Sequence, residues 1–439
     1  MNALIFHKTV EITQQILSFT QPADACLSAF FRANNKLGRQ DRGQIAETVF
    51  ALLRHYEKIH TLLNGHLSAK MAVLCCLMTQ QGFSVSALQD FCNNEEKQCL
   101  IDIKQQAKNL SGSLKSMSNE QLAMSNDNGN LSGSLNIQAE LPFWLIDALR
   151  LSYSDEEIVK IGQAMQMPAP LDIRVNILKN QRDKVLKQLQ EMGLSALATP
   201  FSPYGIRLQD KIAFNKHPLF LDGTIEVQDE GSQLLSLLSG AKRGLTVVDF
   251  CAGAGGKTLA MGVLMQNKGR LYAFDISEKR LNNLKPRLTR SGLGNVLPQR
   301  IDHENDSKLQ RLWNKADIVL VDAPCSGTGT LRRNPDIKYR QSPDKIARIV
   351  EQQASIFQAA SRLVVMGGRL IYATCSLLQA ENEAQVETFL QHNPQFTLEN
   401  AAELLSPYIS VDSSNKMLRL NPVTHNTDGF FAAVLTRKA

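Results

Sequence analysis

Two cysteines follow apolar stretches that have the composition of buried β-strands. Cys325 lies in ADIVLVDAPCSGTG (316–329), and Cys375 lies in GGRLIYATCS (367–376). Because the carboxyl ends of parallel strands open onto one cleft, we expect the two thiols to converge on one substrate. A single cysteine in such a place is more often a structural thiol, so the pair carries the argument.

This pair suits methylation of the C5 atom of cytosine, which is a poor nucleophile. A thiolate that adds to C6 makes the ring enamine-like, so that C5 can attack the methyl group of a sulfonium cofactor. A second group must then help to remove the C5 proton and expel the thiolate, and a second cysteine can do this. Asp322, just before Cys325, can hydrogen-bond the exocyclic amine and N3 of the base. Spacing alone does not say which cysteine attacks.

A glycine-rich turn follows another apolar stretch, TVVDF (246–250). Its small side chains leave the backbone amides open to the carboxylate and ribose of a cofactor. We therefore expect cofactor contacts along the whole turn, from Cys251, Ala252, Gly253, Ala254, Gly255, Gly256 and Lys257.

Two further carboxylates come after the next strand-like stretches. Asp275 ends LYAFD (271–275), about 20 residues further on, where a carboxylate accepts hydrogen bonds from both ribose hydroxyls. The alternative is that Asp275 caps the helix that follows. Asp302 comes after VLPQRI (296–301) and is a candidate acceptor for the adenine amino group.

The elements that position these residues alternate from Thr246 onward between apolar strand, turn and amphipathic helix. This alternation predicts an α/β fold, a Rossmann-like doubly wound and mostly parallel sheet with helices on both faces. Residues 1–108 instead show apolar residues at spacings of three and four, as in Ile45, Val49 and Leu52, which predicts a small all-helical domain.

Composition divides the rest of the chain. Residues 109–139 are rich in Ser, Asn and Gly and contain NLSGSL twice, which predicts a linker. We expect a bridging α+β subdomain over 140–225 and the catalytic domain over 226–439. The 439 residues, 43% hydrophobic and 21% charged, are enough for two or three globular domains.

Charge and cysteine content limit the kinds of partner and metal site that the chain is expected to have. The net charge of +6 permits a polyanionic partner such as RNA but does not identify one. Basic residues in and around the helical segment form either a phosphate-contacting surface or a solvated face: Arg32, Lys36, Arg39, Arg42, Arg54 and Lys58. The eight cysteines form no C-x-x-C pair, so we expect free thiols and no metal. No long apolar run marks a membrane segment, and we expect a cytoplasmic protein.

Through DAPCSGTG, ATCS and DFCAGAGGKT, the chain resembles the RNA cytosine-C5 methyltransferases that carry paired cysteines, over roughly residues 140–439. The resemblance implies S-adenosylmethionine as cofactor, Cys375 as nucleophile and Cys325 as the residue that promotes release. It also implies cofactor contacts from the turn 251–257 and from Asp275, Asp302 and Asp322. Gly253 and Ala254 stand where members usually carry alanine and proline, which loosens the turn.

The helical segment LGRQDRGQIAETVFALLRHY (37–56) looks like the antitermination-factor-type RNA-binding domain of bacterial members that methylate small-subunit ribosomal RNA. This likeness implies 16S rRNA as the partner. We also expect a monomer, with no DNA partner and no membrane. The basic stretch LRRNPDIKYR (331–340) is a candidate for contacts with neighbouring phosphates.

Three alternatives remain open. A tRNA cytosine methyltransferase would use the same chemistry. A non-catalytic RNA-binding protein would account for the altered glycine-rich turn. A nicotinamide-dependent oxidoreductase would also have such a turn and a ribose-binding aspartate, but it would leave Cys325 and Cys375 without a role.

Overall fold

The computed structural model describes residues 1–64, 67–116, 135–209, 212–408 and 416–438. These residues form two compact units. The first consists of Met1–Pro168 together with Thr330–Pro343, and the second of Ala169–Gly329 together with Asp344–Ala439. The segment 330–343 therefore interrupts the second unit in the sequence and packs with the first.

The first unit is helical, as its apolar spacing predicted. Its central helix is α5, in which every residue from Ala72 to Met78 is buried. An all-round apolar helix of this kind must be enclosed by others, and α1, α3, α4 and α6 all contact it. The elements up to the described end of this region are α1 (Ala3–Ile16), α2 (Ala23–Ala33), α3 (Arg39–Arg54), α4 (Tyr56–Leu62), α5 (Ala69–Thr79), η1 (Ser86–Phe91) and α6 (Asn94–Ser116).

The boundaries expected around the linker differ from the structure. Helix α6 continues to Ser116 because strong helix formers, KQQAK at 104–108, carry it past the expected end. Helix α8 (Leu135–Ala139) begins before the expected end of the linker and buries Leu135, Ile137 and Ala139. Of the predicted linker 109–139, residues 117–134 lie outside the described residues.

The bridging subdomain expected over 140–225 is also divided. Helices α9 (Phe143–Leu149) and α10 (Asp155–Gln166) belong to the first unit, which is completed by the short helix α16 (Ile337–Arg340). Gly162 in α10 lies so close to α8 that a Cβ there would come within 2.1 Å of the carbonyl oxygen of Ala139. This backbone approach explains why α10 packs with the helices before it.

A small antiparallel sheet opens the second unit, with strand order β2-β3-β1-β4. The apolar side chains of one face, including Ile173 and Ile206, pack with Val185 and Leu189 of α11. Its elements are β1 (Leu171–Val175), α11 (Arg182–Glu191), β2 (Ala196–Ala198), β3 (Gly205–Leu208), η3 (Phe214–Lys216), α12 (Pro218–Leu221) and β4 (Ile225–Val227).

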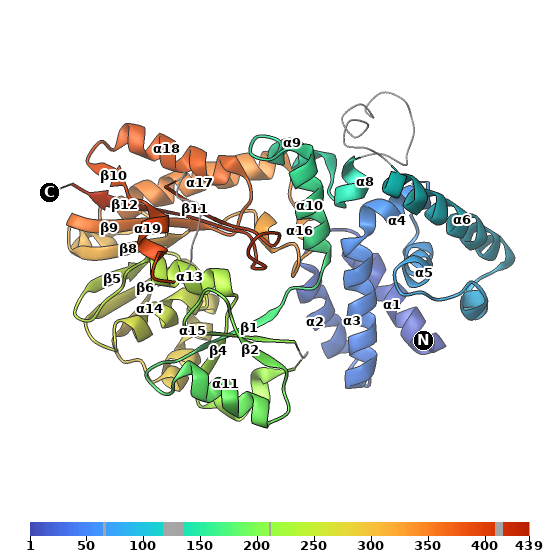
Figure 1. Cartoon of the computed structure of the whole chain (residues 1–439), viewed down its shortest axis with the longest axis horizontal. Helices are drawn as coiled ribbons and strands as arrows, with labels where there is room; N and C mark the ends of the chain where they lie inside the picture. The colour runs from blue at the N-terminus through green and yellow to red at the C-terminus, as the bar shows by residue number, and fades with distance from the viewer. Residues whose placement is uncertain (65–66, 117–134, 210–211, 409–415, 439) are drawn as a thin grey trace. The chain divides into compact units, whose positions relative to one another are not determined.

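The large sheet confirms the predicted α/β fold (Figure 1). Its strand order is β10-β12-β9-β8-β5-β6-β7, with β11 paired to β12. The pairs from β9 to β7 are parallel, and β12 runs antiparallel to β9, β10 and β11. The strands are β5 (Thr246–Asp249), β6 (Arg270–Asp275), β7 (Val296–Arg300), β8 (Ala316–Asp322), β9 (Val364–Thr374), β10 (Phe396–Leu398), β11 (Leu418–Leu420) and β12 (Phe430–Arg437).

Each face of this sheet is covered by helices. Adjacent residues on a strand point to opposite faces, so Val247 belongs to one apolar cluster with Leu259 and Leu284, and Val248 to the other with Phe357. The covering elements are α13 (Glu230–Leu238), α14 (Gly256–Leu264), α15 (Glu278–Ser291), η4 (Ser307–Leu312), η5 (Thr328–Thr330), α17 (Pro343–Ser361), η6 (Gln379–Glu381), α18 (Glu383–His392) and α19 (Ala401–Leu405).

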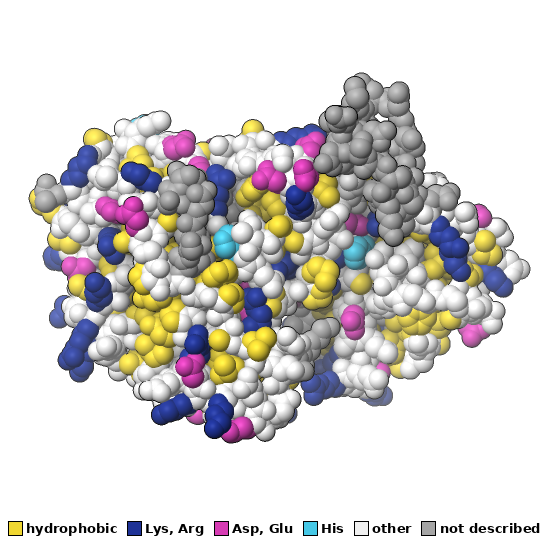
Figure 2. All heavy atoms as spheres, viewed as in Figure 1, with side chains coloured by type: hydrophobic (Ala, Val, Ile, Leu, Met, Phe, Trp, Pro, Cys, Tyr) yellow, Lys and Arg dark blue, Asp and Glu magenta, His cyan; other side chains and the backbone are white. Residues whose placement is uncertain are grey.

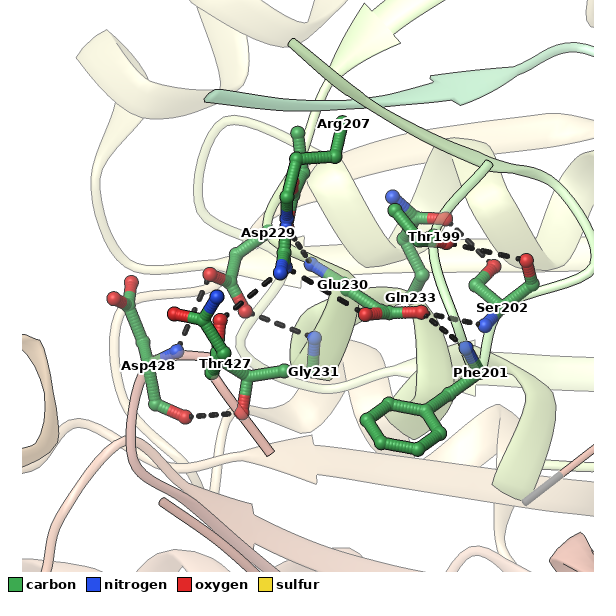
Figure 3. A network of polar contacts seen from close by, with 12 residues as sticks. Thr199, Phe201, Ser202, Arg207, Asp229, Glu230, Gly231, Gln233, Thr427 and Asp428 are labelled. Atoms are coloured by element: carbon green, nitrogen blue, oxygen red, sulfur yellow. Dashed lines mark hydrogen bonds and ion pairs between the residues drawn. The ribbon is translucent and has the colours of Figure 1, made fainter. Parts of the chain in front are cut away.

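A buried polar network fastens the small sheet to the start of α13 (Figure 3). Arg207 on β3 donates from Nε to Asp172 Oδ1 at 2.7 Å and pairs with Glu230 at 3.6 Å. Figure 3 shows Arg207 pointing toward Glu230, whose Oε1 accepts from the amides of Phe201 and Ser202, both at 2.7 Å. The side chains of Asp172 and Glu230 have no exposed surface, so Arg207 balances two buried carboxylates.

We predict that Arg207→Met lowers the free energy of unfolding by about 3–5 kcal/mol, because removing one partner leaves buried carboxylates uncompensated. Urea denaturation followed by circular dichroism would measure the loss. The matched control is Lys187→Met on α11, since Lys187 is 78% exposed and its pair with Glu191 is 3.7 Å long, and such pairs add little. Similar losses in the two variants would contradict this role for the network.

Candidate active site

The carboxyl ends of the parallel strands open onto one cavity of about 700 Å³. Its walls come from the loops after β5, β6, β7, β8 and β9, as the parallel topology requires. The sequence-predicted residues that line it are Cys251, Ala252, Gly253, Ala254, Gly256, Lys257, Asp275, Asp302, Asp322, Cys325 and Cys375. The structure therefore brings together all but one of the residues chosen from the sequence.

Gly255 is the residue that the cavity excludes. Its amide donates to the Ala252 carbonyl at 2.8 Å, which closes the turn before α14. Its φ is +85°, and a Cβ would come within 2.1 Å of Leu284 Cδ1. Glycine is required here for the left-handed backbone and for the close approach of α15, and the cofactor contact expected from Gly255 stays a prediction.

Asp275 holds the glycine-rich turn in place. Its Oδ2 accepts from the amide of Gly253 at 2.8 Å, and its Oδ1 accepts from the amide of Ser277 at 2.7 Å. The helix cap is Ser277, whose side chain accepts from Arg280. Each carboxylate oxygen can accept more than one hydrogen bond, so Asp275 can position the turn and still face a ligand. The sequence predicted its place but not its bond to Gly253.

Asp302 lies two residues beyond β7 at the rim of the cavity. Its side chain is 61% exposed and pairs with Arg300 at 3.0 Å. Ile301, which precedes it, is buried and also lines the cavity. The rim thus offers an apolar surface beside a carboxylate, which suits a flat heteroaromatic group with an amino substituent.

The two cysteine thiols are in contact. Their Sγ atoms lie 3.1 Å apart, and the amide of Cys375 donates to Cys325 Sγ at 3.3 Å. The predicted convergence is therefore confirmed. The pKa of Cys325 is raised well above its ordinary value by its hydrogen bond with Cys375, by burial and by the negative charges of Cys375 and Glu381. At neutral pH Cys325 is consequently a protonated thiol that can donate to its neighbour.

A lysine with 11% of its side chain exposed lines the same cavity as the thiols. Lys257 Nζ donates to Asp322 Oδ2 at 2.7 Å. Burial lowers the pKa of Lys257, but the charge of Asp322, its hydrogen bond and the negative charge of Cys375 together raise it above its ordinary value. Lys257 therefore remains a cation, and its pair with Asp322 is a contact that the sequence analysis did not anticipate. Only Oδ2 of Asp322 is engaged by Lys257.

Glu381 joins the loops that carry the two cysteines. It is fully buried, and its Oε1 accepts from the amide of Ser326 at 2.7 Å and from Gln353 Nε2 at 3.0 Å. Its Oε2 accepts from the hydroxyls of Ser326 and Ser376. The sequence shows this glutamate only as one of two near the start of a helix, because nothing in its spacing reveals a partner 55 positions away.

Two further groups in the cavity have pKa values raised by burial. Asp249, at the end of β5, accepts from Thr258 Oγ1 at 2.6 Å. Burial raises its pKa to about 7, although the hydrogen bond from Thr258 opposes the shift. Burial and the carboxylates of Asp249, Asp322 and Asp275 raise the pKa of Cys251 well above its ordinary value. Cys251 therefore stays a neutral thiol and does not compete as a nucleophile.

The basic stretch at 331–340 does not present Lys338 to a partner. Within the first unit, Lys338 Nζ donates to the carbonyls of Arg54 and Glu140, and burial lowers its pKa to about 8. The guanidinium of Arg54 donates to the carbonyl of Arg332. The phosphate contacts expected from Lys338 and Arg54 are therefore corrected to structural ones, because their charged groups satisfy buried backbone carbonyls.

The loop between α2 and α3, at the opposite end of α3 from Arg54, is open to solvent. Lys36 and Arg39 are exposed there, and Figure 2 shows dark blue side chains gathered over this end of the two helices. Arg42 donates to the carbonyls of Leu37 and Asn35 and so braces the loop between the helices.

Among the described residues there is no group of three His, Cys, Asp or Glu suited to a metal ion. No described helix is long and apolar enough to cross a membrane.

Comparison with known proteins identifies a family for most of the chain from residue 141 onward. Residues 237–436 match the family described as 16S rRNA methyltransferase RsmB/F, and residues 141–215 match the ferredoxin-like domain of RsmF/B-like methyltransferases. A Synechocystis protein named "Probable ribosomal RNA small subunit methyltransferase B" is 35% identical over 306 residues, covering 69% of this chain and 68% of that protein. A Bacillus subtilis protein of the same name is 27% identical and covers 92% of each chain.

Solved structures give the same fold. The crystal structure of a methyltransferase homolog protein from Pyrococcus horikoshii matches with a TM-score of 0.55 and 30% identity, covering 68% of this chain and 99% of that one. The structure of NSun6 from Pyrococcus horikoshii with SFG matches with a TM-score of 0.61 at 24% identity, covering 68% of this chain and 98% of that chain.

The raised pKa of Asp249 predicts that the free energy of unfolding depends on pH. Its folded pKa of about 7 lies above the ordinary value near 4, so this group stabilises the fold below pH ~4 and loses that contribution as pH rises through ~7. Asp249→Asn removes the buried charge and should raise the free energy of unfolding at pH 8 by roughly 1–3 kcal/mol, with little difference from wild type at pH 4.5.

Thermal and urea unfolding at the two pH values would measure this gap. The control is Asp302→Asn, whose exposed carboxylate keeps most of its hydration in the folded state. A difference between Asp249→Asn and wild type that is the same at both pH values would show that the carboxyl is not titrating in this range.

Proposed function

The chain belongs to the family of 16S rRNA methyltransferases RsmB/F, and from this premise we propose that it forms 5-methylcytosine in 16S rRNA through a covalent bond from Cys375 to C6 of the base. It is an S-adenosylmethionine-dependent rRNA methyltransferase. The observation that carries the proposed chemistry is the contact between the Cys325 and Cys375 thiols at the wall of the strand-end cavity.

The residues of the cavity fit S-adenosylmethionine. A side chain at Gly253 would meet no atom within 4 Å, so the turn is open to a ligand on that side. Asp275 is placed to accept from the ribose hydroxyls, and Asp302 to accept from the adenine amino group. The turn and Asp322 are left to bind the remainder of S-adenosylmethionine. We propose these cofactor contacts for the residues of the turn from Cys251 to Lys257. The cofactor, when bound, supplies an electrophilic methyl group.

The environment of the two thiols supports Cys375 as the nucleophile. Cys325 is held as a neutral thiol that can donate a hydrogen bond to Cys375. The Lys257 cation interacts electrostatically with Cys375. The Sγ of Cys375 therefore has a hydrogen-bond donor 3.1 Å away and faces the cavity that Lys257 also lines. Its electron pair forms the bond to C6, and the electrons of the C5–C6 bond become available at C5.

Asp322 is proposed to orient the base. One of its oxygens is engaged by Lys257, and its side chain is 31% exposed at the cavity wall. The remaining oxygen can accept from the exocyclic amine of cytosine, which fixes the ring face toward Cys375. The same aspartate also fixes Lys257. One carboxylate therefore aligns the base, the lysine and the nucleophile.

Cys325 is proposed to complete the reaction. Its pKa is raised chiefly by its bond to Cys375 and by burial. Once Cys375 is bonded to carbon, its negative charge is gone and Cys325 can lose its proton to solvent more readily. The Cys325 thiolate then takes the proton from C5, the Cys375–C6 bond breaks, and its electron pair returns to Cys375.

The helical unit is proposed to hold the rRNA, with Lys36 and Arg39 contacting phosphates. The likeness of this unit to an antitermination-factor-type domain, the monomeric state and the absence of a DNA partner remain predictions. Family membership excludes the nicotinamide-dependent oxidoreductase and the non-catalytic alternative. A tRNA substrate is disfavoured because the matching relatives are named for small-subunit rRNA.

We predict that Cys375→Ala abolishes methyl transfer and that Cys325→Ala accumulates a protein–RNA adduct, since Cys375 can attack but not be released. The assay is a denaturing gel with labelled small-subunit rRNA and S-adenosylmethionine. A slowly migrating band should form with Cys325→Ala and disappear in the double variant Cys325→Ala/Cys375→Ala.

The matched control for thiol loss is Cys99→Ala, because Cys99 is exposed and lies on α6 in the first unit. It should methylate as wild type does and give no adduct. An adduct that persists in the double variant, or forms with Cys375→Ala, would reverse or refute the assignment of the nucleophile.

A further inference from the structure

One side chain of the cavity has no role in the chemistry above. Gln228 follows β4 and precedes α13, and it is 7% exposed. Its Nε2 donates to Ser232 Oγ at 3.0 Å, whereas its Oε1 is buried without a hydrogen-bond partner. The side chain lines the same cavity as Lys257 and Asp275. A buried amide oxygen without a donor costs about 1–3 kcal/mol, so its position calls for a ligand that provides one.

The backbone holds Gln228 rigidly in this position. Its amide donates to the carbonyl of Asp172 on β1 at 3.0 Å, and its carbonyl accepts from Gln233 Nε2 at 2.9 Å. Its neighbours Asp229 and Glu230 belong to the buried network of Arg207. A side chain fixed on both sides in this way loses little further freedom when it binds a ligand.

Gln228 lies beside the start of α14. A Cβ on Gly256, the first residue of that nine-residue helix, would be 3.8 Å from Gln228 Nε2. The residue before it, Gly255, makes no side-chain cap, so the first amides of α14 present partial positive charge to the cavity. An acceptor next to a helix N-terminus is complementary to a group that carries both an ammonium and a carboxylate.

We propose that Gln228 binds the amino-acid end of S-adenosylmethionine, with Oε1 accepting from the α-ammonium while the first amides of α14 face the carboxylate. The inference rests on the proposed function and deepens it. It assigns a cofactor contact to the junction between the small sheet and α13, outside the glycine-rich turn and the strand ends. It also separates the cavity into an end for the amino acid and an end for the nucleoside.

The test compares two ligands that share the nucleoside. S-adenosylhomocysteine carries the whole amino-acid end, and 5′-methylthioadenosine lacks it. Gln228→Met keeps the side-chain length but removes the acceptor, so it should weaken binding of S-adenosylhomocysteine about tenfold and leave 5′-methylthioadenosine nearly unchanged, as measured by calorimetry. Asp275→Asn is the contrasting variant, because loss of a ribose contact should weaken both ligands by the same factor.

Gln228→Glu distinguishes the ammonium from the carboxylate. It keeps the acceptor, and the Ser232 hydroxyl can turn to donate to it, so affinity for S-adenosylhomocysteine should be retained or increased. A large loss in this variant would mean that Gln228 faces the carboxylate and would overturn the assignment. Equal losses for both ligands in Gln228→Met would overturn the contact altogether. Failure of the wild-type protein to bind S-adenosylhomocysteine would instead refute the proposed function.

Discussion

The parallel pairing of β8 with β9 is the constraint on which the site depends. Asp322 lies opposite Ala373 in this pair, so the two strands end side by side and their loops leave the sheet at the same edge. Cys325 and Cys375 come within the first three residues after these strands. Their short loops leave the thiols little room to separate, and Glu381 ties the loops together through Ser326 and Ser376. The register of these two strands thus brings the two thiols together.

Gly429, the residue before the C-terminal strand β12, also helps to secure these loops. The amide of Gly329 donates to the carbonyl of Cys375 at 2.9 Å, and the amide of Gly429 donates to the carbonyl of Gly329 at 2.8 Å. A Cβ on Gly329 would come within 2.1 Å of the Gly429 carbonyl oxygen, so the three backbones can pass only if glycine is present. The chain after the cysteine loop then enters the segment 330–343, where Lys338 caps backbone carbonyls of the first unit.

Electrostatics divides the cavity into groups that carry charge and groups that are kept neutral. Lys257 and Asp322 form an ion pair at the cavity wall, with 11% and 31% of their side chains exposed. Burial favours the neutral forms of Asp249 and Cys251, and the neighbouring thiol favours the neutral form of Cys325. A low-dielectric site strengthens each charge that remains, so the Lys257 cation has a large influence on its neighbours in the cavity. The small sheet contributes to this environment through Gln228 and the Arg207 network, although its sequence suggests only a connecting role.

The sequence by itself determined the α/β fold, the strand ends and most of the residues around the cavity. Apolar runs, glycine-rich turns and the cysteines are local signals, and parallel topology then requires their convergence. Only the tertiary structure decided which groups pair. The Lys257–Asp322 and Glu381–Ser326 contacts, the packing of Gly255 on Leu284, the burial of Lys338 and the unpartnered Gln228 oxygen join residues distant in sequence or depend on burial. Such contacts leave no periodic pattern in the sequence, because they depend on how the chain packs in three dimensions.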